Sequence, residues 1–336
     1  MAPSSSIFLS RAITILRNSF TSISVSRATT ILRNTLECLF SFVLLRDLVL
    51  CLLFLYCGLS PTTVRLDERT SVRLWAPIRP RRRKPSLVLI HGFGGNARWQ
   101  WEHQIRPLSK AFNVYVPDLI FFGDSSSDGD ERSIELQSRC MAEALKKVGL
   151  ERYSVCGISY GGFVAYGMAM VHGEEAIEKV VILTAGICAT EEEREEMKKR
   201  RKGERDIIEI LMPERAEDLR ALMRRSMHRP PWIPDFVLQD VIRVMYKKYR
   251  KERMEMLKEL LSRKIEGDRL PVLNQETLII WGDKDDVFPL SMAHRLKRHL
   301  GKKSRLEIIK DVGHAAQLEN PRMVNDLIKR FILNSH

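Results

Sequence analysis

Short apolar runs alternate with longer stretches of helical periodicity along most of this sequence, and this alternation constrains the fold more than any other feature. Runs such as Ser86–Ile90 and Val180–Leu183 are almost entirely apolar, as expected of strands buried on both faces of a parallel sheet. Strand–helix–strand units in this order form right-handed crossovers. The sequence therefore predicts an α/β fold, with eight strands in a mostly parallel sheet and helices on both faces. The predicted strands are residues 63–66, 71–75, 86–90, 113–116, 153–156, 180–183, 277–281 and 306–309, and the predicted helices are residues 98–108, 134–148, 160–171, 291–300 and 321–332.

Two segments depart from this alternation. The first two predicted strands flank the polar turn Asp67–Thr70, which indicates an antiparallel hairpin at the edge of the sheet. After the sixth strand, residues 189–269 contain no strand-like run, and their apolar residues are spaced for helices that the proline-rich segment 230–234 interrupts. We expect a helical cap (lid) over residues 189–269, inserted into a core formed by residues 61–188 and 270–336.

Residues 1–60 are predicted to form a separate targeting or membrane-anchor segment. Their first part is rich in Ser and Arg, lacks acidic residues and contains a short tandem duplication, residues 10–18 and 26–34. This composition is typical of a transit peptide and equally of the positive flank of a membrane anchor. Residues 38–57 have about the length of a bilayer-crossing helix, but the adjacent charges Arg46 and Asp47 lie near the middle.

The cellular location therefore has several interpretations. Residues 38–57 could form an interfacial helix, a partly buried hairpin or a helix packed against the protein body. We expect a membrane-associated protein, and the alternative is import into a plastid or mitochondrion.

The net charge of +13 comes largely from a few places, including the loop Arg79–Pro85 with five basic residues. No zinc spacing, RNA-binding signature or helix-turn-helix pattern accompanies this charge, so we expect no nucleic-acid partner. A solvated loop that touches anionic lipid is the favoured interpretation. The six cysteines form no C-x-x-C pair, which favours reduced thiols. No metal or organic cofactor is expected, because no ligand spacing for one is present.

The chemistry is predicted to centre on Ser159, in the motif Gly157-Ile-Ser-Tyr-Gly161 between a predicted strand and a helix. Small residues on either side let the chain turn sharply and expose a serine hydroxyl at the helix N-terminus. Such a hydroxyl needs a base. Among the eight histidines, only His314 lies in the short segment just after the last strand. The orienting carboxylate would come from the end of the preceding strand, where the candidates are Asp283, Asp285 and Asp286.

These motifs resemble the α/β-hydrolase family over residues 62–334. In that family the order along the chain is nucleophile, acid, base, and the acid stands three residues after a strand-ending glycine, which is Gly282 here. The resemblance thus implies the triad Ser159, Asp285 and His314, and a cap after the sixth strand. It also implies an oxyanion hole formed by the backbone N–H groups of Phe93 and Tyr160.

The loop Asp118–Ser125 is similar to a family pattern, but it has Phe121 where the first glycine usually stands. The surrounding motifs resemble a serine-nucleophile plant subgroup related to monoacylglycerol lipases and ring-cleavage C–C hydrolases. We expect exposed phenylalanines in this loop to line an apolar pocket. The candidates for the substrate pocket are Phe121, Phe122, Trp232 and Phe288.

A serine nucleophile, rather than a carboxylate, indicates acyl transfer through an acyl-enzyme. The direct interpretation is a serine hydrolase, a carboxylesterase or an enzyme similar to monoacylglycerol lipase, which cleaves a hydrophobic or lipid ester. Two alternatives use the same triad: hydrolysis of a C–C bond, and a small-molecule receptor with slow hydrolysis.

Overall fold

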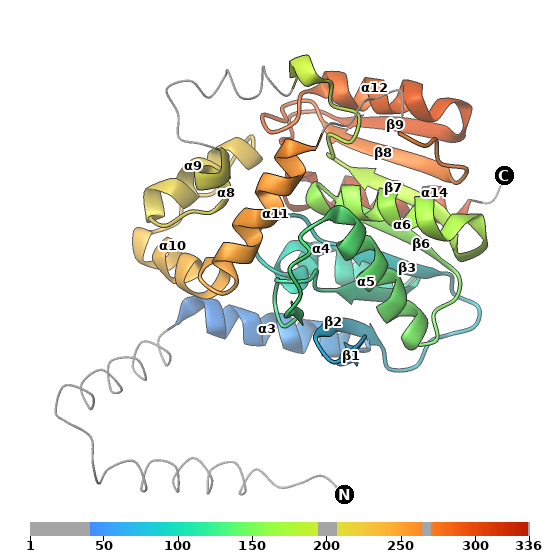
Figure 1. Cartoon of the computed structure of the whole chain (residues 1–336), viewed down its shortest axis with the longest axis horizontal. Coiled ribbons are helices and arrows are strands. Elements are labelled where there is room, and N and C mark those ends of the chain that lie inside the picture. The colour runs from blue at the N-terminus through green and yellow to red at the C-terminus, as the bar shows by residue number, and fades with distance from the viewer. Residues whose placement is uncertain (1–40, 194–206, 264–269, 335–336) are drawn as a thin grey trace, which may run out of the picture. The chain divides into compact units, whose positions relative to one another are not determined.

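The computed structural model describes residues 41–193, 207–263 and 270–334 of the chain. The chain divides into two compact units, residues 1–45 and residues 46–336. The sheet, its covering helices and the cap all belong to the second unit (Figure 1).

A single sheet runs in the order β1-β2-β4-β3-β6-β7-β8-β9, and the two-residue strand β5 (Ser126–Ser127) pairs with β2. Strands β3 to β9 on this path pair in parallel, whereas β1 and β2 form an antiparallel edge hairpin in which Val64 lies opposite Val72. The predicted mostly parallel sheet with an edge hairpin is confirmed. The strands are β1 (Leu59–Arg65), β2 (Thr70–Pro77), β3 (Ser86–Ile90), β4 (Asn113–Pro117), β6 (Tyr153–Ile158), β7 (Ile177–Leu183), β8 (Glu276–Gly282) and β9 (Ser304–Ile309).

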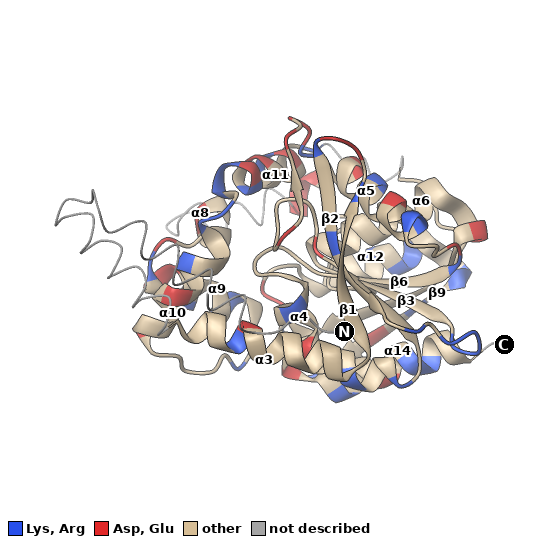
Figure 2. Cartoon of the chain, turned by 90° about the horizontal axis from the view of Figure 1, so that it is seen from below, with Lys and Arg blue, Asp and Glu red and all other residues tan. Residues whose placement is uncertain are grey.

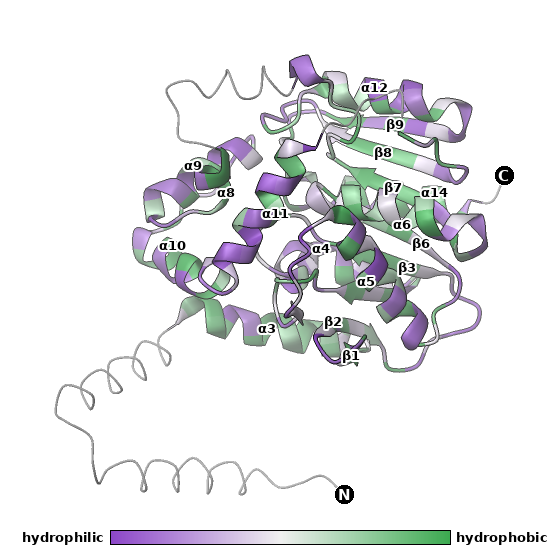
Figure 3. Ribbon diagram, viewed as in Figure 1, coloured by the Kyte–Doolittle hydropathy of each residue, from purple (hydrophilic) through white to green (hydrophobic). Residues whose placement is uncertain are grey.

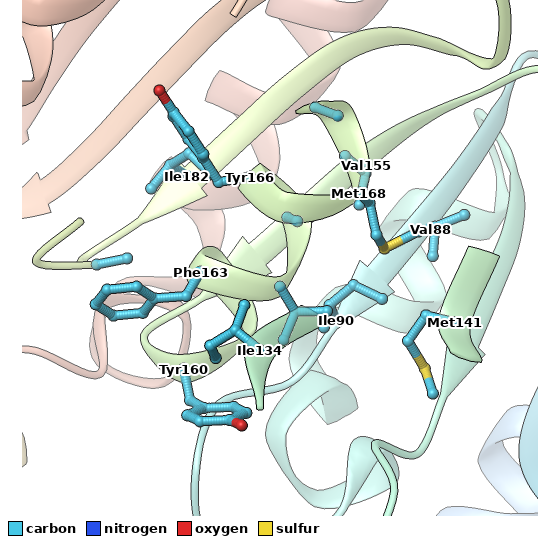
Figure 4. Packing of buried hydrophobic residues seen from close by; sticks show 14 of the residues in the cluster. Val88, Ile90, Ile134, Met141, Val155, Tyr160, Phe163, Tyr166, Met168 and Ile182 are labelled. Atoms are coloured by element: carbon cyan, nitrogen blue, oxygen red, sulfur yellow. The ribbon is translucent and has the colours of Figure 1, made fainter. Parts of the chain in front are cut away.

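The central strands are apolar because both of their faces are covered, as the hydropathy colouring shows (Figure 3). Side chains alternate between the two faces of a strand. In β3, Val88 and Ile90 pack on one face, and Leu87 and Leu89 pack on the other. The helices on the first face are α5 (Ile134–Lys147), α6 (Tyr160–Ala176) and α12 (Leu290–Leu300), and Figure 4 shows part of this core. The helices on the second face include α4 (Ala97–Ser109) and α14 (Pro321–Leu333).

The described residues between β7 and β8 form helices and no strand. The segment around Pro230–Pro234 separates two of these helices, as the sequence predicts, and Pro234 directly precedes α10. We call residues 207–262 the cap helices. They comprise α8 (Ile207–Leu211), α9 (Ala216–Ser226), α10 (Asp235–Val241), the π-helical turn η1 (Ile242–Tyr246) and α11 (Arg250–Ser262).

The helix α3 (Phe42–Tyr56) corrects the expected boundary of the N-terminal segment. From Arg46 onward it belongs to the same unit as the sheet, so the division lies between residues 45 and 46 rather than at residue 60. Two ion pairs contribute to this attachment: Arg46 pairs with Glu102 of α4 at 2.6 Å, and Asp47 pairs with Arg98 at 2.5 Å. Within the part of the chain that the structure describes, no helix has both the length and the apolar character needed to cross a bilayer.

Candidate active site

Ser159 lies on the sharp turn between the end of β6 and the start of α6. Its φ of 52° and ψ of −120° place it in a region that side-chain-bearing residues rarely adopt. Its amide donates to the carbonyl of Leu183 on the neighbouring strand at 2.9 Å, and its own carbonyl accepts from Gly162 at 2.8 Å. These backbone bonds hold the strained residue in place and leave the hydroxyl at the N-terminus of α6.

Glycines allow the turn to pass close to its neighbours. A Cβ on Gly161 would overlap the backbone carbonyls of Ile90 and His91, and a Cβ on Gly157 would overlap Gly161 itself. No side chain can move aside to relieve a clash with backbone. The Gly-x-Ser-x-Gly spacing is therefore required by close packing between β3 and the start of α6.

His314 and Asp285 lie together beyond the carboxyl ends of β8 and β9. Nδ1 of His314 is 3.0 Å from Oδ2 of Asp285, and the Asp285 side chain has no exposed surface. The other carboxylate oxygen accepts from the amides of Val287 and Phe288 at 2.8 and 2.9 Å. With both oxygens bonded, the carboxylate is fixed in the orientation that holds Nδ1 protonated and leaves Nε2 free to act as a base.

The other two candidate carboxylates have different surroundings. Asp283 lies 3.6 Å from the ammonium group of Lys284 and 3.5 Å from the amide of Val312, and Asp286 is exposed. Of the three aspartates left open by spacing alone, the structure brings only Asp285 to His314.

The predicted oxyanion groups come from two loops that meet beside Ser159. Tyr160 is the first residue of α6, where a helix amide has no acceptor within its own helix. Phe93 follows Gly92 in the loop after β3. A Cβ on Gly92 would lie 3.2 Å from Cβ of Ser159, so the loop passes against Ser159. The assignment of Phe93 and Tyr160 to an oxyanion hole stays a prediction.

His91, at the start of this loop, has a structural role. It is fully buried; Nε2 accepts from the Leu119 amide at 3.0 Å, and Nδ1 donates to the Gly92 carbonyl at 2.8 Å. Burial lowers the pKa of His91 to about 4, so the ring is neutral at physiological pH. It fixes the loop and does not face the cavity.

A cavity of about 360 Å³ contains both Ser159 and His314 in its walls. Phe93 and Tyr160 also line it, as does Phe288, one of the predicted pocket residues. Phe288 packs edge-on against His314, with 5.5 Å between the ring centroids. Most of the remaining wall is aliphatic and comes from the cap helices, including Leu211, Leu219, Leu222, Met223, Leu238 and Leu257.

Three of the four predicted pocket residues lie elsewhere. Phe121 and Phe122 are buried in the core and do not line this cavity, because their loop turns its side chains inward. Phe121 has a φ of 71°, which explains why a glycine is usual there, and Arg253 of α11 holds its carbonyl at 2.7 Å. Trp232 is 80% exposed, while the adjacent Ile233 lines the cavity instead. In this irregular segment, consecutive side chains point in different directions.

Three residues near the site carry no recognisable sequence signal. Gln100 of α4 holds both the amide and the carbonyl of Gly92. The Thr184 hydroxyl donates to the carbonyl of His314 at 3.0 Å. Glu319 accepts from the amide of Gly313, next to His314, at 2.6 Å and from the amide of Arg229 at 2.9 Å. No sequence motif marks these hydrogen bonds, and the bonds from Thr184 to His314 and from Glu319 to Arg229 join residues 130 and 90 positions apart.

No group of three or more His, Cys, Asp or Glu side chains among the described residues is arranged to hold a metal ion. That the chemistry needs no metal or cofactor stays a prediction.

Several known proteins of similar sequence are lipases. The human monoacylglycerol lipase ABHD6 is 24% identical over 261 residues, which cover 75% of this chain and 77% of the lipase. Lipase 1 of Psychrobacter immobilis is 27% identical over 251 residues, 73% of this chain and 76% of its own length. These relatives are animal and bacterial, and a plant origin of this chain stays a prediction.

Solved structures show the same fold at low sequence identity. A bacterial membrane phospholipase A superposes with a TM-score of 0.74 at 23% identity, covering 91% of this chain and 96% of its own. The 2-hydroxy-6-oxo-6-phenylhexa-2,4-dienoate hydrolase of Rhodococcus sp. strain RHA1 gives a TM-score of 0.69 at 20% identity, covering 82% and 99%.

The family model for the alpha/beta hydrolase fold matches residues 85–321, which include Ser159, Asp285 and His314. Together with the lipase relatives, this match identifies the chain as a member of the α/β-hydrolase family and as a serine hydrolase.

Proposed function

We propose that this protein hydrolyses carboxylic esters of hydrophobic acyl groups, with Ser159 as nucleophile, His314 as base and Asp285 as orienting acid. The observation that carries the proposal is the 3.0 Å contact between His314 and Asp285 at the wall of an apolar cavity that also contains Ser159. The lipase relatives support ester hydrolysis in general, and the aliphatic wall supports a hydrophobic substrate.

In the proposed first step, Nε2 of His314 removes the proton from the Ser159 hydroxyl as its oxygen attacks the ester carbonyl. The resulting imidazolium is stabilised by the buried carboxylate of Asp285. The negative charge that develops on the carbonyl oxygen is stabilised by hydrogen bonds from the backbone N–H groups of Phe93 and Tyr160. Collapse of the tetrahedral intermediate transfers the proton from His314 to the leaving alcohol and leaves an acyl group on Ser159.

In the second step, His314 removes a proton from a water molecule, which attacks the acyl-enzyme. The same two amides stabilise the second oxyanion. The carboxylic acid then leaves, and His314 returns the proton to the Ser159 oxygen. The aliphatic wall contributed by the cap helices excludes bulk water from the acyl chain, and this environment strengthens the hydrogen bonds to the oxyanion.

The proposed natural substrate is a lipid ester, such as a monoacylglycerol, taken from a membrane surface. An aliphatic cavity of about 360 Å³ is of the size that binds a drug-sized or lipid-like ligand. A lipid of this kind resides in bilayers, so the enzyme would work next to one.

The first test is labelling of the purified protein with a fluorophosphonate probe. Ser159 should be labelled, and the Ser159→Ala protein should not. Asp285→Asn should lower the labelling rate roughly 10³–10⁴-fold by favouring the wrong histidine tautomer. The neighbouring change Asp286→Asn is the matched control and should leave the rate unchanged. Equal effects of the two aspartate variants would contradict the assigned triad.

The second test is a series of esters of increasing acyl length, presented in micelles. Turnover should rise with chain length up to the capacity of the cavity. Release of only about one product per protein would indicate a receptor, and preferential cleavage of a vinylogous diketone would indicate a C–C hydrolase. Either result would overturn the proposed esterase.

A further inference from the structure

Helix α3 carries its charges toward the protein and its apolar side chains toward solvent, the reverse of an ordinary surface helix. Over residues 46–56, the buried side includes Leu50 and Phe54, and Phe54 packs edge-on against Trp75 at 5.2 Å. The opposite side consists of five large apolar or aromatic side chains, each between 44% and 77% exposed. They are Leu48, Val49, Leu52, Leu55 and Tyr56, and we call them the outer face of α3.

The charges that argue against a membrane-spanning helix are used to attach it to α4. The guanidinium of Arg46 donates to both carboxylate oxygens of Glu102 at 2.6 and 2.7 Å. Asp47 accepts from Arg98 at 2.5 and 3.1 Å and from the indole N–H of Trp99 at 3.2 Å. These bonds fix the rotation of α3 about its own axis, so the outer face points away from the protein. Figure 2 shows the helix as mostly uncharged.

A cluster of positive charge adjoins the end of this helix. The amide of Ile78, which leads into the basic loop, donates to the carbonyl of Gly58 just after α3 at 2.9 Å. Cys57 and Gly58 line a surface pocket together with Arg79, Arg81 and Lys84. Arg79, Arg81, Arg82 and Arg83 are exposed, and the loop contains no acidic residue. An apolar helix face next to a basic loop that contains no acidic residue is the combination that binds an anionic lipid surface.

We propose that α3 lies in the plane of a lipid–water interface, with its outer face against the acyl chains and the loop Arg79–Lys84 against anionic headgroups. The proposal rests on the proposed lipid-ester hydrolysis and names the surface through which the enzyme would reach its substrate. An in-plane position keeps Arg46 and Asp47 paired with α4, whereas a transmembrane position would break both pairs and place the charges in hydrocarbon.

This position also brings the bilayer close to the active-site cavity. Trp99 lines that cavity, and α3 touches it directly: the indole bonds to Asp47, and the Arg46 guanidinium lies 5.0 Å from its ring. Only the thickness of one helix, about 10 Å, therefore separates the outer face of α3 from the cavity wall. The exposed aromatic residues Trp232 and Phe236 of the cap are close in sequence to Ile233 and Leu238, which line the same cavity. Aromatic side chains of this kind favour the headgroup region of a bilayer.

The test is co-sedimentation of the full chain with vesicles, carrying Ser159→Ala so that no vesicle lipid is hydrolysed. One set of vesicles contains phosphatidylcholine alone, and the other also contains phosphatidylserine. The protein should bind the phosphatidylserine vesicles more strongly, and this preference should fall as salt is raised. The combined change Leu48→Gln, Leu52→Gln and Leu55→Gln should weaken binding to both sets about tenfold or more.

A matched variant changes three exposed apolar residues elsewhere: Met170→Gln, Val171→Gln and Val272→Gln. It should bind as the parent does. The change Arg81→Gln, Arg82→Gln and Arg83→Gln should abolish the preference for phosphatidylserine, while Arg298→Gln with Lys302→Gln should preserve it. The triple arginine variant does not alter α3. It therefore tests the proposal even if the variant with Leu48, Leu52 and Leu55 replaced, the leucine variant, fails to fold.

The proposal is overturned if the parent binds neither vesicle, or if the leucine variant binds as well as the parent, which would assign binding to residues 1–40. It is also overturned if the leucine variant instead changes the oligomeric state, which would show that a second copy covers the face. Fluorophosphonate labelling in lipid-free buffer, with Ser159 restored, reports on the hydrolase separately. If the protein binds vesicles normally but is not labelled, the proposed hydrolase function is contradicted, whereas the proposed lipid-binding surface is supported.

Discussion

The side-chain amide of Gln100 binds the backbone of Gly92 at both its donor and its acceptor. Oε1 accepts from the Gly92 N–H at 2.7 Å, and Nε2 donates to the Gly92 carbonyl at 3.1 Å and also to the carbonyl of Gly94. Phe93, whose amide is the proposed oxyanion donor, lies between these two glycines. Helix α4 therefore holds the loop that contains the amide proposed as an oxyanion donor.

We expect Gln100→Leu to lower kcat for ester hydrolysis by roughly 10²-fold, because an oxyanion donor displaced by about 1 Å loses much of its effect. The variant should also lose about 1–3 kcal/mol of stability, since the Gly92 amide is left without a partner. Steady-state kinetics and denaturant unfolding measure the two effects.

Gln137 provides the matched control, because it binds both backbone groups of Ile120 in the same way, at 2.9 and 3.1 Å, away from the cavity. Gln137→Leu should lose similar stability with little change in kcat. If both variants lose activity equally, Gln100 has no special role in positioning the oxyanion loop.

The strained backbone of Ser159 leads to a prediction about stability. Ser159→Gly should be more stable than Ser159→Ala by about 1 kcal/mol or more, because glycine adopts a φ of 52° without steric cost. Neither variant can be labelled by a fluorophosphonate. Urea unfolding compares the two proteins, and equal midpoints would show that the turn is unstrained.

Glu319 couples the cap to the histidine loop, because its two oxygens bind the amides of Arg229 and Gly313. Glu319→Ala should lower kcat about tenfold, given that hydrogen bonds to charged groups contribute about 1.5–3 kcal/mol. It should also raise KM more for long acyl esters than for short ones, since the cap wall loosens. Glu217→Ala, at an exposed position of the cap, serves as the control. An equal rise in KM for all chain lengths would argue against coupling through the cap.

The burial of His91 predicts a specific dependence of stability on pH. Its folded pKa of about 4 lies below the unfolded value of about 6.5, so the unfolded chain binds more protons between these values. The free energy of unfolding should therefore fall by up to about 3 kcal/mol from this group as pH drops from 6.5 to 4.

A variant with a non-titrating side chain isolates this contribution. His91→Gln should show a shallower slope of stability against pH over that range, measured by urea unfolding at several pH values. The exposed His294 gives the control, and His294→Gln should keep the slope of the parent protein. If the parent, His91→Gln and His294→Gln proteins all show the same slope of unfolding free energy against pH, His91 is not buried in its neutral form.

The positions of the strands, the edge hairpin and the candidate nucleophile Ser159 could be predicted from the sequence, because each depends on a local pattern. A continuous apolar run such as Leu87–Ile90 is acceptable only where both faces of a strand are covered. The glycines around Ser159 reflect backbone contacts within a single strand–turn–helix unit. His314 is the predicted base because it is the histidine that follows the last strand.

The pocket was the part that sequence patterns predicted least well. Phe121 and Phe122 were expected to face the substrate because a phenylalanine replaces a usual glycine, but hydrophobicity alone does not say which cavity or core a side chain enters. The loop that directs both side chains into the core is held in part by Arg253, which lies 132 residues away along the chain from Phe121 and donates to its carbonyl.

By itself, the sequence determined the α/β class with its edge hairpin, the position of the serine at its turn and the spacing that requires glycine, since these follow from the periodicity and size of neighbouring residues. Only the tertiary structure placed the Asp285 carboxylate against His314, turned Arg46 and Asp47 toward α4 and bonded the Gln100 side chain to the backbone of Gly92. Such choices depend on hydrogen bonds and ion pairs between distant segments, and their energies are decided by distances that a linear pattern does not contain.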